Sequence, residues 1–357
     1  MKKTAAASVV AFVLSIFVTG ASCAETVRHY VFFNMERERI AEPAFLAARS
    51  LEGAQLKYTW KELEPERDRY DFGAIQHDLD FLRSRGKRLF IQIQDASFDA
   101  KTILVPRYLL EDAQYHGGAD MEFEDDEKTP AGWVARRWDP AVRDRFHRLL
   151  AALGRRFDGK IEGINLPETS IEFGESGRRF PKGFTPVAYR DAVIDTMKAL
   201  KRAFPGSTCI QYANFMPGEF LPWTDRSLLR SVYRSARALG VGVGGPDVLP
   251  YKKSQMGNSY GLIRSASART PVGMAVQDGN YEHVDPRTGK RVTIVELLAF
   301  ARDYLGADYL FWCTQEPYYS KELMPFLRGE GRDPVSSLEP SGEVALSADL
   351  KVRRLAP

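Results

Sequence analysis

Short apolar runs alternate with longer amphipathic stretches along most of the chain. The runs are rich in β-branched and aromatic residues, which is typical of strands buried on both faces. Between the runs, apolar residues recur at three- and four-residue spacing, which predicts helices that pack on one face. Eight strands are predicted in this way, over residues 29–35, 54–60, 88–95, 161–166, 208–215, 241–248, 271–277 and 308–314.

Several helix ends carry recognisable signals. Asp139 precedes a proline and predicts a helix that runs to about Phe157. Thr293 and the glutamate three residues later form a capping box. Thr224 is expected to cap a helix that ends before a glycine, and residues 41–51 are expected to be helical.

Strands that alternate with helices imply a parallel sheet, and eight such units in about 300 residues match a (β/α)₈ TIM barrel. A doubly wound open sheet is the alternative, but no glycine-rich phosphate fingerprint follows the first strand. The expected organisation is one barrel domain over residues 25–328 and a tail over 329–357 that packs on it. Residues 96–138 form a long excursion, which is expected to build one wall of a cleft.

The first residues have the pattern of a signal peptide, with a basic start, an apolar run from Val9 to Val18 and small residues before Ala24. Cleavage is predicted after Ala24, which leaves residues 1–24 out of the fold. The protein is then expected in the periplasm or secreted. No stable membrane anchor is expected, because the apolar run is shorter than the roughly 20 residues that a span needs.

Removal of the two lysines in that segment lowers the formal charge from +3 to +1. This near-neutral balance gives no reason to expect a nucleic acid or an anionic membrane surface as partner. Cys209 and Cys313 each lie in an apolar run and are predicted to be buried free thiols. The five histidines lack the spacing of a zinc site, and no cofactor is expected.

The carboxyl ends of the strands meet at one face of such a barrel, where catalytic residues lie. The strand ends of this chain offer carboxylates, amides and aromatic rings, which suit the hydroxyls and C–H faces of a carbohydrate. They show no Ser–His pair, no nucleophilic cysteine near a histidine and no lysine suited to a Schiff base. The predicted catalytic residues are Glu168, Asp278 and Glu316, and the predicted substrate-binding residues are Asn34, Trp60, Gln94, Asn165, Gln211, Asn214, Asp247, Tyr251, Gln277 and Trp312.

One passage resembles a known group of enzymes. The residues from Trp60 to Pro65, followed by Tyr70 to Phe72, are similar to the passage after the second strand of clan A glycoside hydrolases. These are retaining (β/α)₈ enzymes that include β-galactosidases and xylanases. The resemblance implies that Glu168 after strand four is the acid/base, that a glutamate ending strand seven is the nucleophile, and that Trp312 lies under the bound sugar.

The chain departs from that group at strand seven, which ends in Gln277 and Asp278 without a glutamate. Asp278, or less favourably Glu316 of strand eight, would supply the second carboxylate. The predicted function is an exported glycoside hydrolase that cleaves O-glycosidic bonds in an oligo- or polysaccharide with two carboxyl groups. The alternative is a barrel that binds glycan without hydrolysis, with Gln277 in the place of the nucleophile.

Other interpretations remain open from sequence. A metal-dependent hydrolase would hold its ion with Asp95, Glu168 and Asp247. Structural roles are also possible, since Asp278 precedes a turn-forming Gly-Asn pair and Glu316 precedes a proline.

Overall fold

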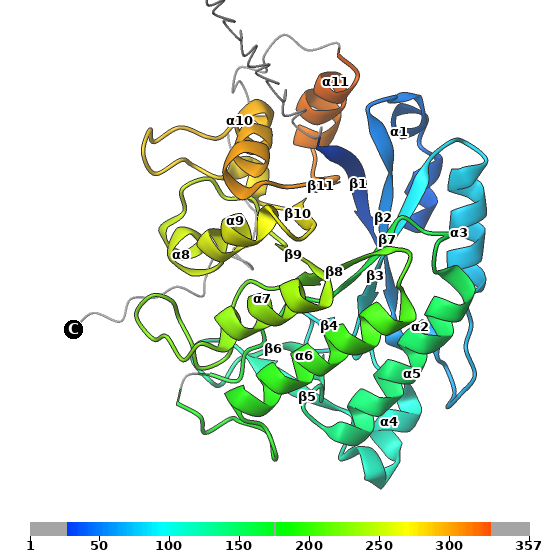
Figure 1. The fold of residues 1–357 in the computed structure, drawn as a ribbon, viewed down its shortest axis with the longest axis vertical. Coiled ribbons are helices and arrows are strands. Elements are labelled where there is room, and N and C mark those ends of the chain that lie inside the picture. The colour runs from blue at the N-terminus through cyan, green and yellow to red at the C-terminus, as the bar shows by residue number, and fades with distance from the viewer. Residues whose placement is uncertain (1–26, 175, 330–357) are drawn as a thin grey trace, which may run out of the picture.

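Eight parallel strands close into a barrel in the order β1-β11-β10-β9-β8-β7-β3-β2 (Figure 1). The computed structural model describes residues 27–174 and 176–329. The predicted eight-stranded parallel barrel is confirmed, whereas the predicted signal peptide and almost all of the predicted tail lie outside the described residues. The barrel strands are β1 (Arg28–Asn34), β2 (Leu51–Thr59), β3 (Arg88–Gln94), β7 (Gly163–Leu166), β8 (Thr208–Tyr212), β9 (Gly242–Gly245), β10 (Val272–Val276) and β11 (Tyr309–Cys313).

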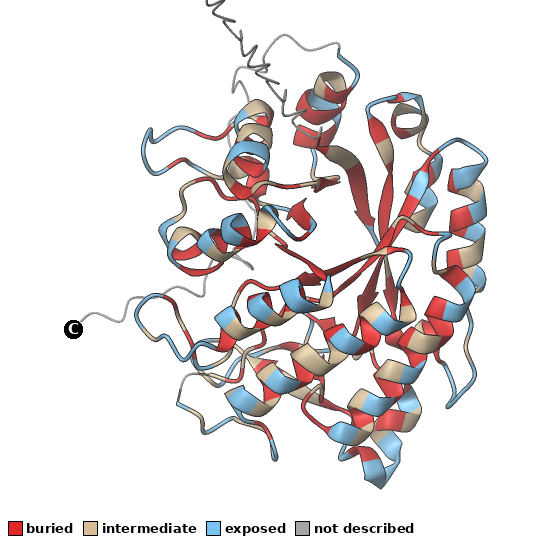
Figure 2. Cartoon of the chain, in the orientation of Figure 1, coloured by how far each residue is buried: buried red, intermediate tan, exposed pale blue. Residues whose placement is uncertain are grey.

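Helices and short helical turns connect the strands and surround the barrel (Figure 1). Figure 2 shows the strands as largely buried and the helices as exposed on their outward sides. The longer helices are α3 (Gly73–Arg83), α5 (Pro140–Phe157), α6 (Pro186–Ala203) and α7 (Leu228–Leu239). The shorter ones are η1 (Arg37–Ala41), α1 (Pro43–Ala47), α2 (Trp60–Leu63), α8 (Lys253–Gln255), η3 (Met256–Tyr260), α9 (Gly261–Ser267), η4 (Asn280–Glu282), α10 (Ile294–Ala299), η5 (Phe300–Leu305), η6 (Tyr319–Leu323) and α11 (Met324–Leu327).

The capping signals had mixed outcomes. Asp139 caps α5, and Thr293 forms the predicted capping box with Glu296. Thr224 does not cap α7, because it pairs with Phe220 in a β-bridge. The helix begins at Leu228, with Ser227 in the N-cap position. The helix expected over residues 41–51 is wrong in length, since α1 ends at Ala47 and Leu51 already pairs with β1 as the first residue of β2.

The excursion after β3 forms a small antiparallel sheet of its own, in the order β4-β6-β5. Arg136, just after this sheet, donates a hydrogen bond of 2.5 Å to the backbone oxygen of Lys182 in the loop after β7. The segment is therefore tied to the end of the barrel at which the carboxyl ends of the strands lie. Its elements are β4 (Ala96–Ser97), α4 (Arg107–Glu111), η2 (Ala113–Tyr115), β5 (Ala119–Phe123) and β6 (Pro130–Ala135).

The barrel interior is layered. Near the amino ends of the strands, the rings of Tyr30, Phe90 and Phe311 lie 4.9–6.2 Å apart and fill the centre. Above them, the Gln55 amide donates a 2.8 Å hydrogen bond to Asn165, across a barrel in which β3 separates their two strands. The side chains of these two residues therefore point inward, and the next inward residues on each strand reach the mouth.

Two further features follow the sequence. Cys209 and Cys313 are free and buried, as predicted. The glycines of β9 permit close strand approach, because a Cβ on Gly244 would lie 1.7 Å from the backbone oxygen of Gly273. Across the described residues, the helices are all too short or too polar to cross a membrane.

Candidate active site at the barrel mouth

Glu168 stands at the mouth of the barrel, two residues beyond the end of β7. Its side chain is half-buried, and its Oε2 accepts a 2.5 Å hydrogen bond from the amide of Asn214, which follows β8. Burial, helped by the negative charge of Asp247, raises the pKa of Glu168 to about 6. The Asn214 hydrogen bond and the positive charges of Lys57 and Arg137 oppose that rise. A carboxyl group with this pKa is protonated in an appreciable fraction of molecules near neutral pH.

Arg137 holds the backbone that carries this carboxylate. Its guanidinium donates two hydrogen bonds to Asp95, of 2.6 and 2.9 Å, and one of 3.0 Å to the backbone oxygen of Glu168. It also bonds the hydroxyl of Tyr189 on α6, which in turn donates to the backbone oxygen of Thr169. The end of β3, the excursion and α6 thus together fix the loop after β7.

Asp247 supplies a second carboxylate just beyond β9. Its Oδ1 accepts a 2.9 Å hydrogen bond from Asn280, whose own Oδ1 accepts from the backbone amides of Val248 and Gln277. Burial raises the pKa of Asp247, and the Asn280 hydrogen bond opposes that effect. One asparagine therefore joins the loops after β9 and β10.

Asp278 is the third carboxylate and lies two residues beyond β10. Its side chain is exposed, and Gln277 beside it is half-buried. The charge of Asp278 acts on Lys57 of β2, as does the charge of Glu168. Lys57 therefore lies within electrostatic range of carboxylates from two different strand ends.

Lys57 is a residue near the mouth that the sequence analysis did not single out. Burial lowers the pKa of Lys57, and the charges of Glu168 and Asp278 oppose that effect. Its ammonium nitrogen lies 5.1 Å from the ring centroid of Phe32 on β1. The strand alternation carried the signal, since Lys57 is two residues beyond Gln55 and shares its inward face.

Two more of the predicted substrate-binding residues lie at the ends of β3 and β1. Gln94, at the end of β3, donates to the backbone oxygen of Ala96, and its buried Oε1 has no hydrogen-bond partner within the described chain. Asn34 is exposed at the end of β1 and adopts a φ of 56°. Both are inward positions by strand alternation.

Three predicted contacts with substrate are wrong, because the side chains are fully buried. Trp312 and Trp60 point outward from the barrel into the helix layer. Trp312 donates to His29 at 3.1 Å, and Trp60 donates to Glu64 at 2.9 Å, both with an exposure of 0%. Asn165 is inward but lies beneath the mouth, bonded to Gln55.

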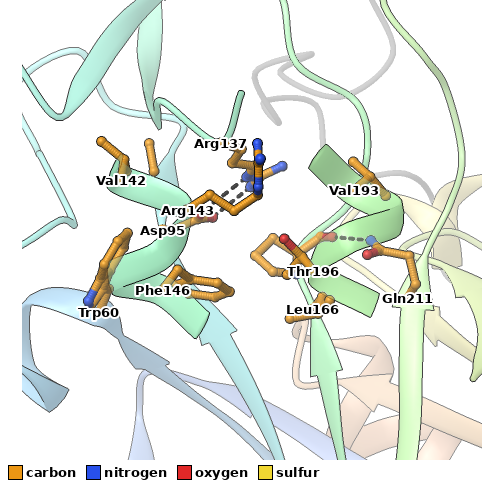
Figure 3. A pocket seen from close by; sticks show the side chains of 12 residues that line it. Trp60, Asp95, Arg137, Val142, Arg143, Phe146, Leu166, Val193, Thr196 and Gln211 are labelled. Carbon is orange, nitrogen blue, oxygen red and sulfur yellow. Dashed lines mark hydrogen bonds and ion pairs between the residues drawn. The ribbon is translucent and has the colours of Figure 1, made fainter. Parts of the chain in front are cut away.

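Gln211 faces a cavity on the outer side of the barrel and not the mouth (Figure 3). Its amide donates a 2.7 Å hydrogen bond to the backbone oxygen of Pro167. Gln211 therefore fixes the backbone of the residue that precedes Glu168. The cavity lies between the strands and helices α5 and α6. It is lined by Trp60, Asp95, Ala135, Arg137, Val142, Arg143, Phe146, Leu166, Pro167, Val193, Thr196 and Gln211.

The proposed metal site is contradicted by the same view. Both carboxylate oxygens of Asp95 are bonded to Arg137 (Figure 3). Over residues 27–174 and 176–329, no group of three His, Cys, Asp or Glu side chains is placed to hold a metal ion. Asp95 is therefore a structural partner of Arg137.

Two further predicted residues, Glu316 and Tyr251, have contacts with residues of the outer helices and turns. The Oε2 of Glu316 accepts a 2.6 Å hydrogen bond from the hydroxyl of Ser320, so Glu316 helps to fix the start of η6. Tyr251 lies among the outer helices, packed against Phe300 and covered by Arg287, whose guanidinium carbon is 3.1 Å from the ring centroid. The stack leaves Tyr251 unsuited to the predicted sugar contact.

The mouth thus combines a carboxyl group of raised pKa, two further carboxylates, a lysine and several amides. A protonated carboxyl group can donate a proton to a leaving oxygen, and an ionised one can attack a carbon or activate water. The amides and the lysine can fix hydroxyl groups by hydrogen bonds.

Comparisons with known proteins find similarity at the level of solved structures. No protein-family model matches the chain, and no curated protein sequence matches it either. The similar structures are TIM-barrel glycosidases. A xylanase from Paenibacillus barcinonensis is 17% identical, with a TM-score of 0.47 over 84% of this chain and 88% of its own.

A β-galactosidase from Halorubrum lacusprofundi is 13% identical, with a TM-score of 0.49 over 80% of this chain. An exo-β-1,4-mannosidase from an Opitutaceae bacterium is 12% identical, with a TM-score of 0.48 over 86%. This chain spans 52% of that β-galactosidase and 61% of that mannosidase. At these identities the likeness assigns no activity to the chain.

Proposed function

We propose that the protein is a glycoside hydrolase that cleaves O-glycosidic bonds in an oligo- or polysaccharide. Glu168 is the general acid, and Asp278 is the second carboxylate. The observation that carries the proposal is the half-buried Glu168 at the mouth end of β7, with its pKa raised to about 6 and its Oε2 bonded to Asn214. A glycosidic oxygen is a poor leaving group unless it is protonated as the bond breaks.

The two carboxyl groups have different surroundings, which suits two different roles. Burial and Asp247 favour the protonated form of Glu168 by raising its pKa. Asp278 is exposed and lies in the field of the Lys57 cation. Glu168 would protonate the leaving oxygen while Asp278 either attacks the anomeric carbon or activates a water molecule. Attack gives retention of configuration and water activation gives inversion.

Asp247, Asn214, Gln94, Asn34 and Gln277 would contact the sugar. Each lies at the carboxyl end of a barrel strand, and their carboxylate and amide groups complement hydroxyls. Asp247 also acts through Glu168, whose pKa it raises. We further propose that the protein is exported and cleaved after Ala24, which the mass of the mature protein would test.

Turnover of a panel of aryl glycosides and polysaccharides tests the hydrolase proposal. Glu168→Gln and Asp278→Asn are expected to lower kcat/KM by about 10²- to 10⁴-fold, the usual contribution of such groups. Glu316→Gln is the matched control, because it neutralises a carboxylate that serves Ser320. The anomer first formed, followed by NMR, reports retention or inversion.

The leaving group separates the two roles. A dinitrophenyl glycoside needs no proton on its leaving oxygen, so Glu168→Gln is expected to retain far more activity on it than on a natural glycan. Asp278→Asn is expected to lose activity on both substrates. Equal losses in the two variants on both substrates would contradict the assignment of Glu168 as the acid.

A second function, glycan binding without hydrolysis, is favoured by one observation. Gln277 is the first residue after β10 and is half-buried at the mouth, where the resembled enzymes carry a glutamate. An amide there cannot act as a nucleophile. Binding of glycans without any turnover, with affinity unchanged by Glu168→Gln, would support this function over the first.

A further inference from the structure

Lys57 is placed where a ligand in the mouth would meet it. It lies on the inward face of β2, with Phe32 of the neighbouring strand β1 against its ammonium at 5.1 Å from the ring centroid. Glu168 and Asp278, at the ends of β7 and β10, both act on its charge. The side chain keeps partial exposure, so solvent and small groups reach it.

Within the described part of the chain, the ammonium of Lys57 has no acceptor for its three donors. Over the described residues it makes no hydrogen bond and has no carboxylate oxygen within 4.0 Å. Two other cations, the buried Lys87 and the half-buried Arg137, do have hydrogen-bond partners. Lys87 donates to two backbone oxygens at 2.6 and 2.7 Å, and Arg137 forms two hydrogen bonds with Asp95. An ammonium that is partly exposed and has no protein acceptor for its donors can donate hydrogen bonds to a ligand that enters the mouth.

We propose that Lys57 is a substrate-binding residue whose ammonium donates a hydrogen bond to a sugar hydroxyl held between Glu168 and Asp278. The inference rests on the proposed glycan-active site and names the sugar that the site accepts. Both carboxylates act on the charge of Lys57 but lie more than 4.0 Å from its nitrogen, so neither forms a direct ion pair with it. A hydroxyl accepts from the ammonium and donates to a carboxylate, so one group satisfies both.

The charge of the mouth selects an uncharged sugar at this position. Among the described residues, the three carboxylates of Glu168, Asp247 and Asp278 outnumber the two lysines whose charges act on them, Lys57 and Lys252, because Arg137 is already paired with Asp95. A uronic acid would bring a further negative charge against these three carboxylates. Neutral hexoses or pentoses are therefore expected as substrates, with uronic acids excluded from this position.

Lys57→Met tests the inference, since methionine keeps the length and the apolar contact with Phe32 but removes the charge and the donors. Lys198→Met is the matched control, because Lys198 is an exposed lysine on α6. Lys57→Met is expected to lower kcat/KM about 10- to 100-fold, the range for a lost hydrogen bond to a charged group. Lys57→Arg is expected to recover part of the loss. The kcat/KM of Lys198→Met is expected to stay at the wild-type value.

The pH profile separates contact in the site from a merely structural role. The charge of Lys57 lowers the pKa of Glu168, so Lys57→Met is expected to move the alkaline limb of kcat/KM to higher pH. Thermal melting of each variant checks the fold. Unchanged kcat/KM and an unmoved limb in a folded Lys57→Met would overturn the inference, and so would a wild type that prefers uronic-acid substrates.

The same variants distinguish this inference from the proposed function. If the wild type binds neutral glycans without turnover, hydrolysis fails, and a Kd about 10- to 100-fold weaker in Lys57→Met supports the inference by itself. An equal Kd in both proteins would overturn it. A wild type that neither binds nor cleaves any glycan in the panel would overturn both.

Discussion

The side-chain amide of Asn214 donates a 2.5 Å hydrogen bond to Oε2 of Glu168. The two residues come from the ends of neighbouring strands, β8 and β7, so barrel closure brings them together. A bond to the carboxylate favours its charged form and limits how far burial raises the pKa. The pKa of about 6 is the balance of these opposing effects.

This balance predicts the pH dependence of hydrolysis. A general acid must be protonated, and Glu168 loses its proton as the pH rises through its pKa of about 6. We expect kcat/KM to fall about tenfold for each pH unit well above 6, in a series of initial rates from pH 4 to 9. A flat profile between pH 6 and 9 would exclude Glu168 as the acid.

Asn214→Ala is expected to move the decline of kcat/KM to higher pH. The substitution removes the hydrogen bond that lowers the pKa of Glu168, so the carboxyl group stays protonated to a higher pH. The same amide group also accepts from the backbone of Ser170, so melting must show that the loop is intact. A limb that stays in place, or moves to lower pH, would contradict the role given to Asn214.

Glu168→Gln is expected to change the pH dependence of stability. Because the folded pKa is raised from 4.5 to about 6, the contribution of Glu168 is fully present below pH 4.5 and is lost as the pH rises through 6. The loss is about 2 kcal/mol for a shift of this size. The free energy of unfolding of Glu168→Gln, relative to that of the wild type, should therefore be up to about 2 kcal/mol higher at pH 7.5 than at pH 4.

Urea unfolding of both proteins at pH 4 and pH 7.5 measures this difference. Glu316→Gln serves as the control, because Glu316 is exposed and its carboxylate is bonded to Ser320. The prediction fails if the stability difference between Glu168→Gln and the wild type is the same at the two pH values.

The pair of Arg137 and Asp95 is expected to stabilise the loop after β7, which carries Glu168. Removing one partner leaves a buried charge without compensation, and Arg137→Met should lower the free energy of unfolding by about 3–5 kcal/mol. The double substitution Arg137→Met with Asp95→Leu should recover much of that loss. Additive losses in a double-mutant cycle would show that the two groups do not stabilise each other.

Trp312→Phe is expected to leave substrate affinity within about twofold of the wild type, because the indole has no exposed surface and points away from the mouth. Its free energy of unfolding should fall by about 1–3 kcal/mol through lost packing and the lost bond to His29. A tenfold or greater rise in KM, with stability preserved, would instead support the prediction that Trp312 lies under the bound sugar.

The sequence by itself determined the barrel. Strands buried on both faces must be apolar along their length, and helices between them must carry one apolar face, so the βα period is written locally. Local signals also placed the cap at Asp139 and the capping box at Thr293. Glu168 was found because a carboxylate directly after a buried strand marks the mouth of such a barrel.

Only the tertiary structure decided which side chains share the mouth. A one-residue change of position turns a strand residue from the interior to the helix layer, and this placed Trp312 and Gln211 outside the mouth and Lys57 on its inward side. Trp60 begins helix α2 and is buried in the helix layer. The pKa of Glu168 likewise depends on Asn214, Asp247 and Lys57, which lie far apart in the chain. Burial and charge are sums over spatial neighbours, and barrel closure alone sets those neighbours.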